Sequence, residues 1–180
     1  RSPVGIAGSL MVLIVILVAL LTPVIAPHDP AQHHRKERFL PPSWMAEGSS
    51  EYLLGTDQLG RDVLSRILFG SRISVLIGVA AALIGGTLGS VLGLIAGYYG
   101  GLADGIISRF LDAFLAVPFI VLVLAIVGVL GPSLFTIIAV LGVTGWASYA
   151  RVVRGETLSV KEREFVTAAR VVGTRPLQIA

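Results

Sequence analysis

The sequence predicts an all-α fold, a polytopic bundle of membrane-spanning helices, and two observations carry that prediction. Apolar residues make up 54% of the chain and charged residues only 14%, with a mean hydropathy of +0.86. An ordinary soluble domain has about a quarter of its residues charged. The apolar residues also gather in long stretches without any charge, and as helices these stretches are long enough to cross a bilayer.

The first stretch covers residues 4–26 and contains no charged residue. As a helix it would be roughly 34 Å long, which is enough for a hydrocarbon core of ~30 Å. A cleaved signal peptide is the alternative, but its apolar region normally has only about 7–15 residues. We therefore expect a membrane helix. Because the chain begins with Arg1 and not with methionine, and because it stops within the motif of residues 159–180, we also expect both ends to be truncated.

Residues 27–51 are rich in proline, histidine and charge and have no apolar periodicity, which indicates a solvated loop outside the bilayer. Its histidines suggest a divalent-metal site as one alternative; they are His28, His33 and His34. Basic residues of the same segment would repel a cation; they are Arg35, Lys36 and Arg38. We favour exposed loop histidines and expect no metal site.

Residues 53–70 have a different pattern, in which Leu59, Val63 and Ile67 recur at every fourth position. Two acid-first pairs share the same spacing, Asp57 with Arg61 and Asp62 with Arg66. Such i,i+4 pairs stabilise a helix by about 0.2–0.5 kcal/mol each. The segment therefore predicts a short interfacial helix that leads into the next span.

No charge occurs between Arg72 and Asp104, and glycine recurs there at every fourth position. The stripe consists of Gly85, Gly89, Gly93 and Gly97. Small residues at this spacing let two helix backbones approach closely in lipid, so the stripe predicts a packing face. The partner helix could belong to this chain or to a second subunit.

Residues 100–112 are expected to form a tight loop with Asp104 as the N-cap of the next helix and Arg109 close enough to pair with Asp112. The following charge-free stretch, residues 113–150, would be about 57 Å long as one helix, nearly twice what a bilayer needs. We therefore expect two spans, residues 113–130 and 132–150, separated at Gly131, with a kink at Pro118 in the first.

The last segment, residues 159–180, is the only long polar stretch with helical periodicity. Ser159 and Glu162 form a capping-box pattern, and Gly173 suits a left-handed C-terminal cap. A narrow apolar stripe follows at i, i+3, i+4 and i+7, formed by Phe165, Ala168, Ala169 and Val172. A second helix is expected after Thr174, so the segment predicts two short helices separated by a bend.

Two motifs resemble a known family. Thr167-Ala168-Ala169, followed after three residues by Gly173, resembles the Glu-Ala-Ala-(x)3-Gly loop of ABC importer permeases, with Thr167 in place of the usual Glu. The segment Leu-Gly-Thr-Asp-Gln-Leu-Gly-Arg-Asp-Val-Leu-Ser-Arg, residues 54–66, is similar to one in the dipeptide/oligopeptide branch of the same family. The resemblance covers roughly residues 53–180.

The resemblance implies the transmembrane domain of a type I ABC importer, with four spans here of an expected six. Its parts would be an N-terminal membrane helix (1–27), an extracytoplasmic loop with an amphipathic helix (28–72) and the start of the permease module (73–180). Residues 150–180 would be cytoplasmic and form the coupling helix. The ATPase-coupling residues implied by the family motif and its surroundings are Glu164, Phe165, Thr167, Ala168, Ala169, Val172 and Gly173.

The resemblance also implies partners in a prokaryotic cell membrane. These are a second homologous permease subunit, two ABC ATPase subunits that carry the ATP and Mg²⁺, an extracytoplasmic substrate-binding protein and the lipid bilayer. The residues expected to contact the binding protein are Asp57, Arg61, Asp62 and Arg66, with the open alternative that their helix packs against its own bundle. The expected substrate is a peptide or a related small solute.

Several other functions are disfavoured. The chain has no P-loop, so we expect no bound ATP or other cofactor in it. Its basic residues are mixed with acids, which argues against nucleic-acid binding, and no nucleophile with a positioned base suggests an enzyme. Residues 73–103 and 113–150 contain no Asp, Glu, His, Lys or Arg, whereas ion-coupled carriers usually keep an ionisable side chain of this kind in the membrane. An ion-coupled secondary transporter or channel subunit and a structural scaffold stay open as alternatives.

Overall fold

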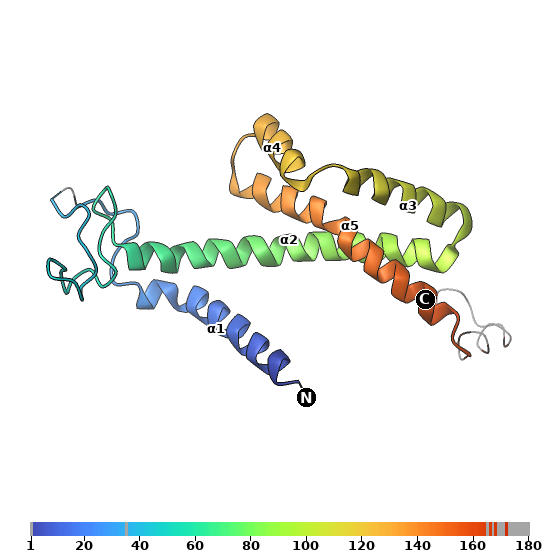
Figure 1. Ribbon diagram of the computed structural model, residues 1–180, viewed down its shortest axis with the longest axis horizontal. Coiled ribbons are helices and arrows are strands. Elements are labelled where there is room, and N and C mark those ends of the chain that lie inside the picture. Colours follow the sequence, from blue (N-terminus) through green and yellow to red (C-terminus); the bar gives the residue numbers. More distant parts are fainter. Residues whose placement is uncertain (1, 35, 165, 167, 169–171, 173–180) are drawn as a thin grey trace. The chain divides into compact units, whose positions relative to one another are not determined.

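The computed structural model describes residues 2–34, 36–164, 166, 168 and 172, and five helices follow one another through these residues (Figure 1). They are α1 (Pro3–Ile25), α2 (Val63–Tyr99), α3 (Gly101–Ala116), α4 (Phe119–Leu130) and α5 (Leu134–Lys161). Apart from one isolated bridge between Thr56 and Asp62, the regular structure of this part of the chain is helical. The all-α prediction is confirmed. The chain divides into two compact units, residues 1–76 and 77–180.

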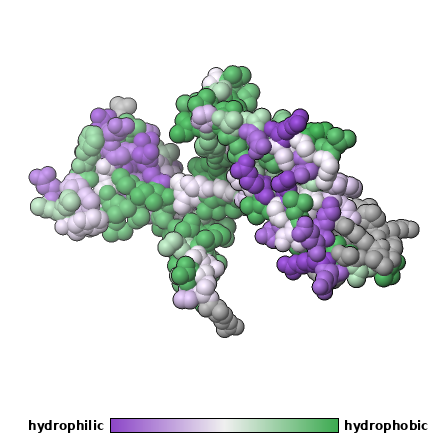
Figure 2. All heavy atoms as spheres, turned by 45° about the vertical axis from the view of Figure 1, so that its right-hand side comes forward, coloured by the Kyte–Doolittle hydropathy of each residue, from purple (hydrophilic) through white to green (hydrophobic). Residues whose placement is uncertain are grey.

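Three of the described helices, α1, α2 and α5, are long and apolar enough to cross a membrane. Helices α3 and α4 meet the same criteria only together, as one bent span, which brings the number to four. Figure 2 shows hydrophobic side chains over much of the helical surface, with hydrophilic ones gathered over the loop between α1 and α2 and around the end of α5. The chain is therefore a multi-pass membrane protein, as predicted.

In the first unit, α1 packs against the first turns of α2 through a buried threonine. The Thr22 hydroxyl lies 2.8 Å from the Val18 carbonyl oxygen of its own helix and 3.1 Å from the Leu68 carbonyl oxygen of α2. Thr22 is completely buried. A polar group that is buried away from water needs a hydrogen-bond partner. This contact therefore fixes the position of α1 along the first turns of α2.

The predicted interfacial helix over residues 53–70 is wrong in extent. Residues 53–62 form turns, and α2 begins at Val63 and continues without a break into the apolar span. Gly55 and Gly60 both adopt positive φ, 76° and 75°, which a helix does not accommodate. The i+4 periodicity of Leu59, Val63 and Ile67 therefore straddles a turn and a helix.

The predicted loop over residues 100–112 is also wrong. Only Gly100 separates α2 from α3, and it adopts a φ of 66°, as Gly101 adopts 53°. These two glycines reverse the chain direction within one turn, which a left-handed backbone makes feasible without a longer loop. Asp104 therefore lies in the first turn of α3 rather than at its N-cap.

The predicted span over residues 113–130 is not one kinked helix. Helix α3 ends at Ala116, α4 begins at Phe119, and the two helices bend by 84° at the break between them. Pro118 supplies no N–H and disfavours helical geometry at Val117, so the helical ladder is interrupted there. The break predicted at Gly131 agrees with the end of α4 at Leu130.

Helix α5 is longer than the predicted span 132–150. It continues through Ser159, so the predicted helix start at Ser159 is wrong. It begins after Ser133, whose hydroxyl accepts a hydrogen bond from the Thr136 N–H at 3.0 Å, and it ends only at Lys161. Ser159 lies inside it, because the backbone continues helically from the apolar part into the polar part. The predicted second helix after Thr174 lies outside the described residues.

The core of the second unit centres on Trp146 of α5. Its ring lies 5.9 Å from the ring of Phe110 and 5.7 Å from that of Phe114, both of α3. Leu111, Ala147 and Ala150 complete the buried cluster. Aromatic pairs at such distances add about 0.5–1.5 kcal/mol beyond their burial, so this cluster holds α3 against α5.

Candidate functional site

The first candidate site is the junction of α2, α3 and α5, which consists of the stretches 85–99, 101–112 and 142–161. It combines the glycine stripe predicted from the sequence with polar contacts that the sequence did not predict. It lies within the second unit and ends where the polar terminal segment begins.

The glycine stripe of α2 lies against α5 of the same chain. A Cβ atom added to Gly85 would lie 2.9 Å from the Gly142 carbonyl oxygen, and one added to Gly89 would lie 2.3 Å from the Trp146 carbonyl oxygen. At Gly93 the corresponding distance to the Ala150 carbonyl oxygen is 2.5 Å. Real Cβ atoms do not approach so closely, so glycine at these positions is what allows the two backbones to meet.

The last glycine of the stripe meets a side chain as well as backbone. A Cβ atom on Gly97 would lie 2.6 Å from Cβ of Thr157 and 3.0 Å from the Arg154 carbonyl oxygen. Four successive turns of α2 thus contact α5, from Gly85 to Gly97. The partner helix that the sequence left open is therefore α5.

An ion pair joins α3 to the same turn of α5. The Arg154 guanidinium donates through Nε to Asp104 Oδ1 at 2.5 Å and through NH2 to Oδ2 at 2.8 Å. Ser108 donates to the same carboxylate at 3.0 Å. The two side chains are 32% and 22% exposed, so water screens this pair only in part.

A second pair on these helices is of a different kind. Arg151 contacts Asp112 through one nitrogen at 3.3 Å, and the two side chains are 62% and 75% exposed. Exposed single-contact pairs contribute about 0–1 kcal/mol. The predicted pairing of Asp112 with Arg109 is replaced by this contact, because α3 runs beside α5.

Lys161, the last residue of α5, reaches back to α2. Its Nζ atom donates to the Tyr98 carbonyl oxygen at 2.7 Å. The last carbonyl groups of a helix have no partner within it, and a cation there is favourable. Lys161 therefore ties the end of α5 to the end of α2.

The predicted coupling segment is described only in part. Phe165, Thr167, Ala169 and Gly173 lie outside the described residues. Glu164 and Ala168 are exposed, Val172 is 83% exposed, and the Val172 N–H donates to the Ala168 carbonyl oxygen at 3.1 Å. Val166, which lay off the predicted apolar stripe, is 3% exposed.

The second group of predicted site residues lies in the loop between α1 and α2. Asp57 receives hydrogen bonds from the Arg61 side chain at 2.8 Å and from the Leu59 and Arg61 backbone N–H groups at 2.8 and 3.0 Å. Arg66 also contacts the Asp57 carboxylate. Burial raises the pKa of Asp57, but these hydrogen bonds outweigh it and hold the pKa well below its usual range.

The predicted pair of Asp62 with Arg66 does not form, because Asp62 caps α2 instead. Its carboxylate accepts hydrogen bonds from the Ser65 N–H at 2.9 Å and the Ser65 hydroxyl at 2.6 Å. The side chain of Asp62 is 1% exposed. A buried cap cannot face a partner protein, so Asp62 is removed from the expected binding-protein contacts, and Arg66 pairs with Asp57.

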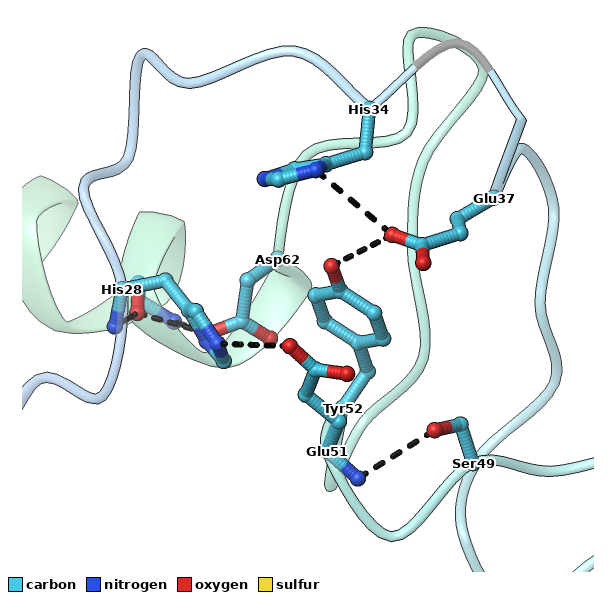
Figure 3. A network of polar contacts seen from close by, with 8 residues as sticks. His28, His34, Glu37, Ser49, Glu51, Tyr52 and Asp62 are labelled. Carbon is cyan, nitrogen blue, oxygen red and sulfur yellow. Dashed lines mark hydrogen bonds and ion pairs between the residues drawn. The ribbon is translucent and has the colours of Figure 1, made fainter.

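Figure 3 shows how the rest of this loop is organised around Tyr52. The Tyr52 hydroxyl donates to the Glu37 carboxylate at 2.6 Å, and His34 lies 3.6 Å from the same carboxylate. This hydrogen bond, together with burial, raises the pKa of Tyr52 to about 12. The loop therefore has its own polar core.

His28 occupies the other side of that core. Its ring lies 3.5 Å from the Asp62 carboxylate and 3.8 Å from that of Glu51 (Figure 3). His28 and His34 are partly buried rather than exposed as expected, at 22% and 34%. Across the described residues, no cluster of three or more histidine, cysteine or acidic side chains has the arrangement of a metal site.

Sequence reasoning missed the contact of Asp104 with Arg154 and that of Lys161 with Tyr98. Both join residues more than 40 positions apart, which no local pattern reveals. The available signal was that Asp104, Arg154 and Lys161 are among the few charges that border the apolar stretches. Charges in such places require partners, because lipid cannot solvate them.

The fold defines the class, an all-α multi-pass membrane protein, and comparison with known proteins gives the family. Residues 89–180 match the family of binding-protein-dependent transport system inner membrane components. Residues 1–42 match the N-terminal transmembrane domain of oligopeptide transport permease C.

Curated relatives agree with these matches. The dipeptide transport system permease protein of Escherichia coli strain K12 is 43% identical over 173 residues, which cover 96% of this chain and 58% of that protein. The di/tripeptide transport system permease protein of Pseudomonas aeruginosa strain UCBPP-PA14 is 38% identical over 175 residues, 97% of this chain and 58% of that protein. The oligopeptide transport system permease protein of Bacillus subtilis strain 168 is 36% identical over 174 residues, 97% of this chain and 55% of that protein.

The chain belongs to the family of binding-protein-dependent transport system inner membrane components. It spans a little over half the length of these curated relatives. The family resemblance found in the sequence motifs is thereby confirmed.

Proposed function

We propose that this chain is part of a permease subunit of an ABC importer for peptides. The observation that carries the proposal is the family membership together with relatives named for dipeptide, di/tripeptide and oligopeptide transport. The subunit forms half of a translocation path, and a second homologous permease subunit forms the other half.

The proposed energy source is ATP hydrolysis in two separate ATPase subunits. The segment after α5 carries the Ala168-Ala169-(x)3-Gly173 motif, and its exposed residues Glu164, Ala168 and Val172 are available for a partner. Helix α5 runs unbroken from the apolar core of the second unit to Lys161, directly before this segment. A movement of the docked segment is therefore transmitted along a continuous helix.

A soluble substrate-binding protein is proposed to deliver the substrate to the translocation path. The loop between α1 and α2 offers Arg61 and Arg66, which both contact the Asp57 carboxylate, with the Arg66 side chain 44% exposed. We keep Asp57, Arg61 and Arg66 as proposed contacts for that protein, and the hydrogen bonds to Asp57 hold both arginine side chains in place.

The test uses the full-length subunit assembled with its partners. Ala168→Glu places a charge and a longer side chain on the proposed docking surface, whereas Ala168→Ser changes the size little and is the matched control. We expect Ala168→Glu to lose at least tenfold in co-purified ATPase, a loss equivalent to ~1.4 kcal/mol, and in uptake. Full co-purification and uptake by Ala168→Glu would rule out this role for the segment.

A further inference from the structure

We propose that Asp104, Arg154 and Lys161 are positioning residues that make the end of α2, α3 and α5 move as one rigid body when the terminal segment moves. The inference rests on the proposed function, because it concerns how that segment transmits movement to the spans. It concerns only the junction defined above.

The connection between α2 and α3 is intrinsically a hinge. Gly100 and Gly101 are consecutive, both have positive φ, and an added Cβ at Gly101 would meet nothing within 4 Å. A pair of glycines gives the backbone more freedom than any other pair of residues. Without further contacts, α3 could swing about this connection.

The ion pair between Asp104 and Arg154 restricts this hinge. Asp104 lies one turn after Gly101, and its carboxylate is held by two nitrogens of Arg154 and by the Ser108 hydroxyl. A two-point contact with a planar guanidinium fixes direction as well as distance. The pair therefore sets the angle at which α3 leaves the hinge.

The same part of α5 also holds α2. The Arg154 carbonyl oxygen lies against Gly97, and Lys161 donates to the Tyr98 carbonyl oxygen. Gly97 and Tyr98 lie directly before the hinge, and Asp104 lies directly after it. Both arms of the hinge are thus attached to one stretch of α5, residues 154–161.

This stretch lies at the C-terminal end of α5. Residues 154–161 are the last two turns of α5, about 12 Å of helix, and the proposed coupling segment follows directly. A force applied to that segment reaches the attachment points before it reaches the apolar core. Loss of the ion pair would leave α5 attached to α2 through the glycine contacts and to α3 through the cluster around Trp146, while the first turn of α3, next to the hinge, could lag behind.

Distance measurement tests rigidity directly, and residues 1–180 contain no cysteine that would compete for a spin label. Ile106 of α3 and Val152 of α5 are 68% and 66% exposed, so cysteines there accept spin labels without disturbing the buried contacts of the junction. Pulsed electron spin resonance on the complete complex in nanodiscs would be recorded without nucleotide and with ATP trapped. We expect the same narrow distance distribution in both states, and a distance that differs between the states would overturn the proposal.

Functional coupling is the second readout. Asp104→Asn should lower the number of substrate molecules imported per ATP hydrolysed by about tenfold, and the reversed pair Asp104→Arg with Arg154→Asp should recover most of it. The matched control is Asp112→Asn, which removes the exposed pair between the same two helices and should stay within twofold of the unmodified complex. An unchanged ratio in Asp104→Asn would contradict the proposal.

These outcomes separate the inference from the function on which it rests. If the unmodified complex imports peptide without ATP, the proposed function fails. If that complex couples import to ATP while the spin-label distance changes or Asp104→Asn keeps a normal ratio, only the inference fails. Should Asp104→Asn not assemble, the spin-label comparison on the unmodified sequence still decides.

Discussion

The replacement Gly89→Ala probes the helix contact on which the junction depends. The added Cβ would lie 2.3 Å from the Trp146 carbonyl oxygen, 2.6 Å from Tyr149 Cβ and 2.9 Å from the Ala150 nitrogen. Comfortable contacts between such atoms need about 3.5–4.0 Å. Helices α2 and α5 would therefore have to separate by roughly 1 Å at this turn.

The free-energy cost of Gly89→Ala follows from the kind of atoms that the added Cβ would meet. Overpacking of a well-packed interior costs about 1–3 kcal/mol. Two of the three contacts of Gly89 are backbone atoms, which cannot rotate away, so we expect a cost in the upper half of that range, about 2–3 kcal/mol. This corresponds to a factor of about 30–150 in the equilibrium between packed and separated helices.

The matched control lies three positions away on the same helix. A Cβ added to Gly86 has its nearest neighbour, Tyr149 Cε1, at 3.9 Å, which is an ordinary contact. Both replacements change glycine to alanine inside α2, so the gain in helix propensity cancels between them. Gly85→Ala, with 2.9 Å to the Gly142 carbonyl oxygen, should fall between the two.

The assay is the temperature at which the assembled permease complex loses its monodisperse peak on size-exclusion chromatography. We expect Gly89→Ala to lower this temperature by about 4–12 °C relative to Gly86→Ala. This range takes about 2–4 °C per kcal/mol, the value for a chain of about 150–250 residues. Equal temperatures for the two variants would refute the close contact between α2 and α5.

Two further predictions concern the loop between α1 and α2. Asp57→Asn should lower the hydrogen-exchange protection of the Leu59 and Arg61 amides, since the pKa of Asp57 is depressed in the fold and its carboxylate therefore stabilises the loop. That stabilisation is present above the unfolded pKa and lost as pH falls, so the difference from the unmodified loop should be constant above about pH 5 and shrink below about pH 4; a difference unaffected by pH would speak against the carboxylate. Tyr52→Phe removes the hydrogen bond to Glu37 and should lower the stability of the loop by about 1.5–3 kcal/mol. Limited proteolysis within the loop should then be faster. The control Ser50→Ala, at an exposed position, should leave the proteolysis rate unchanged.

Much of the fold could be predicted because single helices follow local rules. The charge-free stretches predicted the spans, and the glycine spacing predicted a close packing face. Local rules failed where two of them competed. Ser159 and Glu162 have the pattern of a helix start, yet Ser159 continues α5, since an existing helix extends by one bond per residue whereas a new one requires nucleation.

The junction itself could not be predicted, for a different physical reason. The contact of Asp104 with Arg154 depends on the reversal at Gly100 and Gly101, which places α3 beside α5. Taken alone, Asp104 and Arg154 are each equally compatible with a charged side chain that only faces water at the membrane surface. The bend of 84° after Ala116 likewise depends on how α4 packs against α5, beyond the local effect of Pro118.

The central claim is that ATP hydrolysis in partner subunits drives peptide import through this subunit, and uptake by reconstituted vesicles tests it most directly. The complete complex would be reconstituted with its binding protein, and entry of a labelled dipeptide would be measured with ATP, without ATP, and with a dissipated ion gradient. The account predicts uptake only when ATP is present on the side of the ATPases, whether or not an ion gradient exists. Uptake that continues without ATP, or that stops when the ion gradient is dissipated, would contradict it.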